Sequence, residues 1–182
     1  MQWTIPGTTL TGQRENAQTI EPVFEAMFLA GGLTLSQVAS ITGLEAHTIQ
    51  NWVKRGFLSA PKGKRYTLEQ LCRIININML KGVLPLEKIC RLMSYINGDL
   101  SDESDDLVDD AMLYFMFVRV AARARHLGGT QEWNQALTEV TQDYAEPVPG
   151  AKEKLKRVLR IMLTAWVASR LKWEAETMLG QL

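Results

Sequence analysis

Residues 35–58 have the sequence LSQVASITGLEAHTIQNWVKRGFL, in which two short helical patterns flank a tight turn. Ala39 supplies the small residue needed where two helices cross, and Gly43, four residues later, tolerates a positive φ in the turn. Apolar anchors fall on the inward faces of both helices: Val38, Leu44, Ile49 and Trp52. Because a generic helical hairpin requires no such combination, this segment predicts a helix-turn-helix.

Burial of these anchors leaves a polar face on the second helix. Its side chains can donate and accept hydrogen bonds at base edges or contact phosphates. We therefore predict a DNA-binding set on this helix: His47, Thr48, Gln50, Asn51, Lys54 and Arg55. The alternative role of Lys54 and Arg55 is stabilisation of the helix C-terminus, and His47 can equally be exposed without a base contact.

The next segment, residues 58–66 (LSAPKGKRY), is rich in turn-forming and basic residues. It predicts a short β-hairpin, or wing, with a tip at Lys62-Gly63-Lys64. Lys62, Lys64 and Arg65 place three cations in four residues, which favours contact with a phosphate backbone over a merely solvated tip. Tyr66, like Trp52, is expected in the core.

Helices are predicted on both sides of this region, and together they indicate a mainly α fold. Residues 20–30 form a first helix that ends at Gly31-Gly32, and Thr34 caps the next one through a capping box with Gln37. Further helices are expected over 67–81, from Pro85, from the acidic segment to His126, over 131–144 and over 151–179. The predicted organisation is a loose arm and helix (1–32), a winged helix-turn-helix (33–98), an acidic linker (99–110) and an all-α domain (111–182).

The charge distribution supports this division. The chain has no net charge, but residues 33–98 hold nine Lys and Arg against three Glu, whereas residues 99–150 hold three Arg against eleven Asp and Glu. Residues 151–182 are again basic. A basic head beside an acidic segment is typical of a nucleic-acid-binding module on a body that does not bind nucleic acid. The basic start of the last helix is either balanced by the acidic segment or is a second phosphate contact.

Residues 111–118 are apolar on all sides, which predicts a helix that is buried all round, often within an oligomer. We predict an effector or dimer surface here and on the last helix: Tyr114, Phe115, Met116, Phe117 and Trp166. Core or dimer interface is favoured over a ligand pocket. Trp173 is expected on the same inward stripe as Trp166.

Residues 49–61 (IQNWVKRGFLSAP) resemble the second helix and its exit in MerR-family regulators. Lys64-Arg65-Tyr66-Thr67 resembles the wing and third-helix cap of that family, and residues 71–89 resemble its third and fourth helices. The resemblance implies a MerR-like winged helix that binds double-stranded DNA. The chain departs from the family at Gln50, where an arginine is usual, and it lacks the long coiled-coil dimer helix and the cysteine loop of the metal sensors.

The whole chain is also similar to the bacterial family called domain of unknown function 1836. The similarity lies in GGLTLSQV (31–38), NWVKRG (51–56), the Lys-Arg-Tyr wing and the acidic link to a helical tail. It implies a MerR-like head with a tail of unassigned function.

The sequence therefore predicts a sequence-specific transcriptional regulator that binds double-stranded DNA as a homodimer, with an effector left open. The alternatives are a protein-interaction adaptor with a winged-helix shape and an excisionase-like architectural DNA binder. An enzyme is not expected, because there is no Gly-rich phosphate loop, GxSxG motif or nucleophile set. No cofactor is expected, and no metal either, because Cys72 and Cys90 form no CxxC pair and 99–110 lacks calcium-loop spacing. Without a membrane span or signal peptide, a cytoplasmic location is expected.

Overall fold

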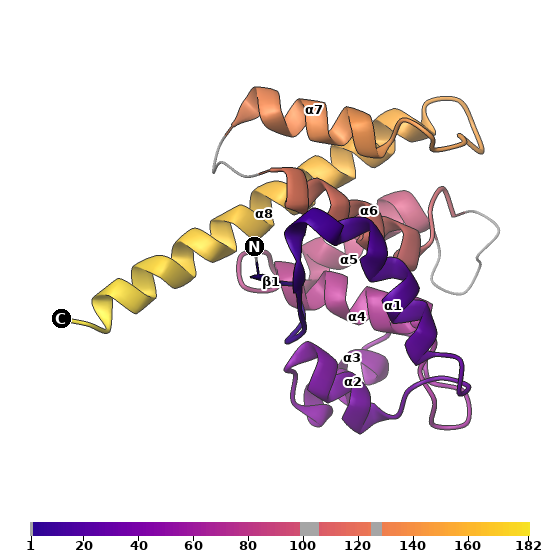
Figure 1. The fold of residues 1–182 in the computed structure, drawn as a ribbon. Coiled ribbons are helices and arrows are strands. Elements are labelled where there is room, and N and C mark those ends of the chain that lie inside the picture. The colour runs from indigo at the N-terminus through magenta and orange to yellow at the C-terminus, as the bar shows by residue number, and fades with distance from the viewer. Residues whose placement is uncertain (1, 99–105, 125–128) are drawn as a thin grey trace.

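The computed structural model describes residues 2–98, 106–124 and 129–182. Within these ranges the chain is mainly helical, with one small antiparallel sheet (Figure 1). The helices are α1 (Ile20–Met27), α2 (Leu35–Thr42), α3 (Ala46–Lys54), α4 (Leu68–Leu80), α5 (Leu86–Asn97), α6 (Asp110–Arg123), α7 (Thr130–Val140) and α8 (Ala151–Leu179). The acidic residues 99–105 and the predicted helix end at His126 lie outside the described residues.

Residues 2–19 are tied to the rest of the protein, which corrects the expectation of a loose arm. Strand β1 (Gln2–Thr4) pairs with β2 (Thr11–Gln13), and a 3-10 helix, η1 (Arg14–Thr19), leads into α1. Trp3 and Ile5 are buried. Tyr114 of α6 donates a hydrogen bond to the Pro6 carbonyl at 3.0 Å. The polar composition of this segment concealed a few apolar side chains that tie it to the core.

Helices α2 and α3 form as predicted, and their caps explain where they begin and end. Thr34 and Gln37 make both hydrogen bonds of the capping box at the start of α2. Gly43 follows α2 with φ of +67°, a left-handed conformation that costs glycine little. Val38, Ile49 and Trp52 are buried between these helices and the rest of the molecule.

The predicted hairpin is present in minimal form. Lys62 and Arg65 are bridged, and Gly63 and Lys64 between them both have positive φ, the pattern of a type I′ turn. Tyr66 is bridged in turn to Leu33 on the strand-like approach to α2. Gly32 lies here with φ of +94°, and a Cβ on it would approach the Tyr66 carbonyl to 2.8 Å, so this close pairing requires glycine.

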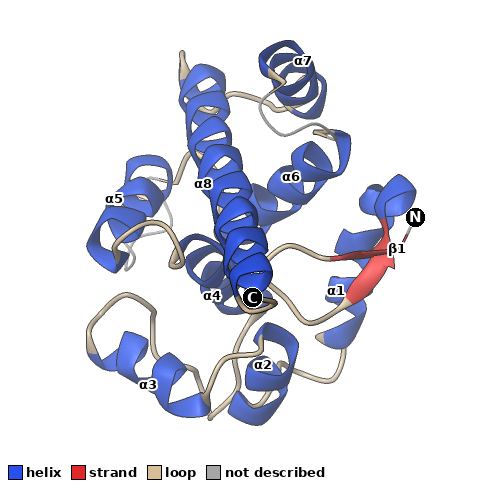
Figure 2. Ribbon diagram, turned by 90° about the vertical axis from the view of Figure 1, so that its left-hand side faces the viewer, coloured by secondary structure: helices blue, strands red, loops and turns tan. Residues whose placement is uncertain are grey.

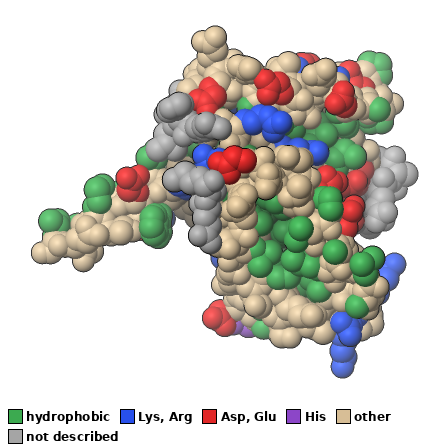
Figure 3. Space-filling view, viewed as in Figure 1, with side chains coloured by type: hydrophobic (Ala, Val, Ile, Leu, Met, Phe, Trp, Pro, Cys, Tyr) green, Lys and Arg blue, Asp and Glu red, His purple; other side chains and the backbone are tan. Residues whose placement is uncertain are grey.

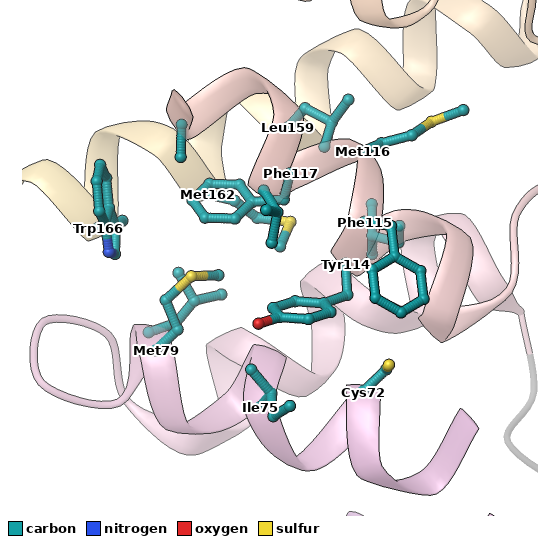
Figure 4. Packing of buried hydrophobic residues seen from close by; sticks show 14 of the residues in the cluster. Cys72, Ile75, Met79, Tyr114, Phe115, Met116, Phe117, Leu159, Met162 and Trp166 are labelled. Atoms are coloured by element: carbon teal, nitrogen blue, oxygen red, sulfur yellow. The ribbon is translucent and has the colours of Figure 1, made fainter. Parts of the chain in front are cut away.

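Helix α4 is the centre of the molecule. Figure 2 shows it with α2 and α3 below, α5 and α6 on either side and α8 crossing in front. Its residues Leu71, Ile74, Ile75 and Ile77 are fully buried, and α6 packs across it through Tyr114 and neighbouring side chains (Figure 4). A single hydrophobic core therefore runs through residues of both halves of the chain.

Helix α8 has two different halves. Its first part is buried against α6 and α7 through Leu155, Leu159 and Met162, whereas its C-terminal part projects away from the body (Figure 1). Across the described ranges, no helix combines the length and the apolar character that a bilayer crossing requires.

Candidate nucleic-acid interface

Helix α3 presents one continuous polar stripe to solvent. His47, Gln50, Asn51 and Lys54 are all exposed, and their spacing of three, four and seven residues places them on one helix face. Thr48, also predicted as a contact, is half-buried at the edge of this face. The opposite face is fixed because Ile49 and Trp52 are buried in the core. The stripe is therefore held rigidly, while its side chains remain available.

Arg55, at the C-terminus of α3, is engaged within the protein. Its Nη2 donates to Glu87 Oε1 of α5 at 2.9 Å, and its guanidinium lies 4.6 Å from the centre of the Phe57 ring. The sequence did not reveal this ion pair, because its partners are 32 residues apart. More than half of the Arg55 side chain is still exposed, so the pair is weak and a phosphate could compete for it.

The cations of the wing are all exposed at its tip. Figure 3 shows Lys and Arg side chains projecting at the lower right, where the α1–α2 and α3–α4 connections lie in Figure 1. Lys62 and Lys64 are exposed, and Arg65 donates from Nη1 to the Gly32 carbonyl at 3.1 Å. Arg65 therefore also fixes the wing against the segment that leads into α2. Gln70 of α4 holds the base of the same loop by donating to the Ser59 and Ala60 carbonyls.

A buried ion pair connects this surface to the helical tail. Arg73 of α4 donates from Nε to the Phe57 carbonyl just after α3, and from Nη1 to Asp110 Oδ2 at the start of α6, both at 3.0 Å. Asn76 adds a hydrogen bond to the Asp110 carbonyl. Burial raises the pKa of Asp110 above its usual value, although Arg73 beside it acts in the opposite direction. The segment just after α3 is thus joined by one side chain to the first turn of α6.

The predicted effector or dimer surface lies inside the single chain. Tyr114, Phe115 and Phe117 of α6 are buried, and Trp166 of α8 packs edge-on against Phe117 with the ring centres 6.0 Å apart. The apolar pattern was correct for burial, but η1, α1, α4, α7 and α8 of the same chain supply the covering surface.

Met116 alone of that predicted set lines a cleft of about 910 Å³ between α4, α6 and the α7–α8 connection. Arg73, Asp110 and Arg119 line it too, together with several acidic side chains. The cleft is open, and both polar and apolar side chains line it.

Comparisons with known proteins give a family match over part of the chain but no activity. Residues 28–117, which run from the end of α1 into α6, match the family described as Domain of unknown function (DUF1836). The chain is 26% identical over 125 residues to the "Uncharacterized protein YkrK" of Bacillus subtilis (strain 168), in a match covering 66% of this chain and 54% of the relative. The chain thus spans about half of the length of that curated relative. No solved structure gives a significant match.

Proposed function

We propose that this protein binds double-stranded DNA and regulates transcription as a sequence-specific, MerR-like winged helix-turn-helix protein. In this proposal α3 enters the major groove and the wing lies along the phosphate backbone. The observation that carries the proposal is the combination of the rigid polar stripe on α3 with the exposed basic tip of the wing.

The dimensions and chemistry of α3 suit this role. An α-helix with its side chains is about 10–12 Å across, so the nine-residue α3 fits a major groove about 12 Å wide. Gln50 and Asn51 can each make two hydrogen bonds to an adenine edge, while Lys54 at the helix end can reach a phosphate. Arg55 can contact a phosphate only after its ion pair with Glu87 breaks. We therefore assign the phosphate contacts to Lys54 and the wing before Arg55.

Charge also favours this end of the molecule. Residues 33–98 carry a net charge of +6, whereas residues 99–150 carry −8. A duplex is therefore attracted to the head and repelled by the acidic segment that follows it. The basic start of α8 is partly neutralised within the protein, since Lys156 pairs with Glu153 at 2.9 Å. The guanidinium of Arg160 is held by a hydrogen bond to the Asn134 side chain.

Fluorescence anisotropy with a duplex selected from a random library, measured over a series of salt concentrations, tests the proposal. The double variant Lys62→Ala/Lys64→Ala should weaken binding to all duplexes and reduce the salt slope by about 0.9 per lost phosphate contact. Asn51→Ala should cost about 1–3 kcal/mol on the selected site, with little change in salt slope. Arg65 is left intact because it anchors the wing to Gly32.

The matched control is Lys154→Ala/Lys156→Ala in α8, which removes the same charge from the other basic segment. It should leave DNA binding nearly unchanged. A folded protein that binds no duplex at low salt contradicts the proposal and favours the adaptor. Binding without any preference among duplexes favours the excisionase-like architectural role instead, and loss of binding only in the α8 control moves the interface to that helix.

A further inference from the structure

The cleft of about 910 Å³ beside α4 and α6 is large enough for a small organic ligand, since ligand pockets commonly measure about 300–1,000 Å³. Its lining comes from segments that are far apart in the sequence, including α1, α4, residues 106–119 and the connection after α7. Apolar side chains form part of this lining: Leu107, Val108, Met112, Met116, Val140 and Pro147. The cleft can therefore take a ligand with an apolar portion.

The charged side chains of the lining favour a cationic ligand. Six carboxylates line the cleft against two guanidiniums: Glu21, Glu69, Asp106, Asp109, Asp110 and Asp143 against Arg73 and Arg119. Both guanidiniums already have acidic partners. Arg73 donates to Asp110 at 3.0 Å, and Arg119 lies 3.8 Å from Glu21 across the cleft wall. The lining side chains thus carry a formal net charge of −4, which attracts cations and repels anions.

Two side chains of this lining hold acceptor oxygens without a donor among the described residues. Asn97 is 5% exposed and Asp110 is 9% exposed, and in each the Oδ1 atom is buried without a hydrogen-bond partner. An unsatisfied buried acceptor is unfavourable, and a ligand that brings N–H or O–H groups to it removes that penalty. Because both residues line the cleft, they favour a ligand that donates hydrogen bonds.

We propose that the cleft binds an organic compound with primary ammonium groups on an apolar body, of which an alkyl diamine is the simplest form. A primary ammonium group combines the positive charge that the lining attracts with three N–H donors for its acceptor oxygens. The methylene chain packs against Met112 and Met116. A bare divalent ion fits less well, because within the described ranges no three His, Cys, Asp or Glu side chains are grouped as metal ligands. This proposal is independent of DNA binding and is tested without DNA.

Isothermal titration calorimetry of the full chain at low salt, with three probes of the same chain length, tests the chemistry of the ligand. 1,6-Diaminohexane should bind saturably at one site per chain. Hexamethonium, its fully N-methylated analogue, keeps both charges but has no N–H donor, so it should bind at least about tenfold more weakly. 1,6-Hexanediol keeps hydrogen-bond donors but has no charge, and it should bind at least about tenfold more weakly as well.

Substitutions in the lining test the location of the site. Met112→Lys places an ammonium group at the cleft and should abolish binding of 1,6-diaminohexane through like-charge repulsion. Met112 is 39% exposed, and its control is Ile161→Lys in α8, at a side chain that is 40% exposed and does not line the cleft. Asp143→Lys should weaken binding about fivefold, whereas Glu174→Lys, the same charge change near the end of α8, should leave it unchanged.

Circular dichroism establishes that each variant is folded, and the exposed Asp143 provides a test even if Met112→Lys is unstable. A wild type that shows no saturable binding of 1,6-diaminohexane overturns the proposal. Equally strong binding of hexamethonium or 1,6-hexanediol overturns it too. Binding of Ca²⁺ or Mg²⁺ that Met112→Lys removes, without binding of the diamine, assigns the cleft to a metal ion instead. Diamine binding that all four substitutions weaken equally reflects net charge alone and also overturns the proposal.

Discussion

Replacing Arg73 with Met tests whether the head and the tail are held together by a buried charge. Arg73 is 5% exposed, and its guanidinium donates to Asp110 Oδ2 and to the Phe57 carbonyl. Met fills a similar volume without charge, so the substitution leaves a buried carboxylate without its partner. Breaking a buried ion pair in this way costs about 3–5 kcal/mol of unfolding free energy.

The loss of unfolding free energy in Arg73→Met should become smaller as pH falls. Burial already raises the pKa of Asp110 with Arg73 present, and removal of Arg73 should raise this pKa further. The folded variant then binds a proton that the unfolded chain, with an ordinary carboxyl pKa near 3.9, does not hold. Its stability therefore increases as pH falls through the raised pKa, and the deficit relative to wild type shrinks.

Urea denaturation of both proteins at about pH 8 and about pH 5 measures these differences. The control is Arg55→Met, because Arg55 pairs with Glu87 at the surface, where an ion pair contributes at most about 1 kcal/mol. If Arg73→Met costs less than about 1 kcal/mol at pH 8, or if its deficit is larger at pH 5, the assignment of this pair is refuted.

Two further predictions concern packing. In urea denaturation, Gly7→Ala should destabilise the protein by about 1–3 kcal/mol more than Gly63→Ala. Both glycines have positive φ, but only at Gly7 would a Cβ approach another side chain closely, with Ile75 Cγ2 at 2.7 Å. Equal costs of the two substitutions would contradict the packing of the N-terminal hairpin on α4. Alkylation of the native protein should modify Cys90 before Cys72, since burial raises the pKa of both thiols but only Cys90 is partly accessible. Peptide mapping by mass spectrometry before and after denaturation measures this order, and equal labelling of both in the native protein would argue against a buried Cys72.

Local rules were sufficient to predict much of the head. The capping box at Thr34, the left-handed Gly43 and the turn at Gly63 depend on interactions within a few residues, and all are present. The apolar period likewise identified Ile49 and Trp52 as buried, which leaves the polar stripe of α3 outside. These features are decided by backbone geometry and side-chain spacing, which the sequence displays directly.

Contacts between distant segments could not be predicted in the same way. Sequence pattern predicts that α6 is buried but not what buries it. Most of its residues are buried, although Met112 is exposed, and the covering surfaces come from η1, α4, α7 and α8 of the same chain. Arg55 with Glu87 and Arg73 with Asp110 are 32 and 37 residues apart, so only the fold brings them together. The apolar period of α8 continues beyond residue 169, yet Trp173 is exposed because this part of the helix projects from the body. Periodicity defines which face of a helix is apolar, whereas the position of neighbouring elements decides whether that face is buried.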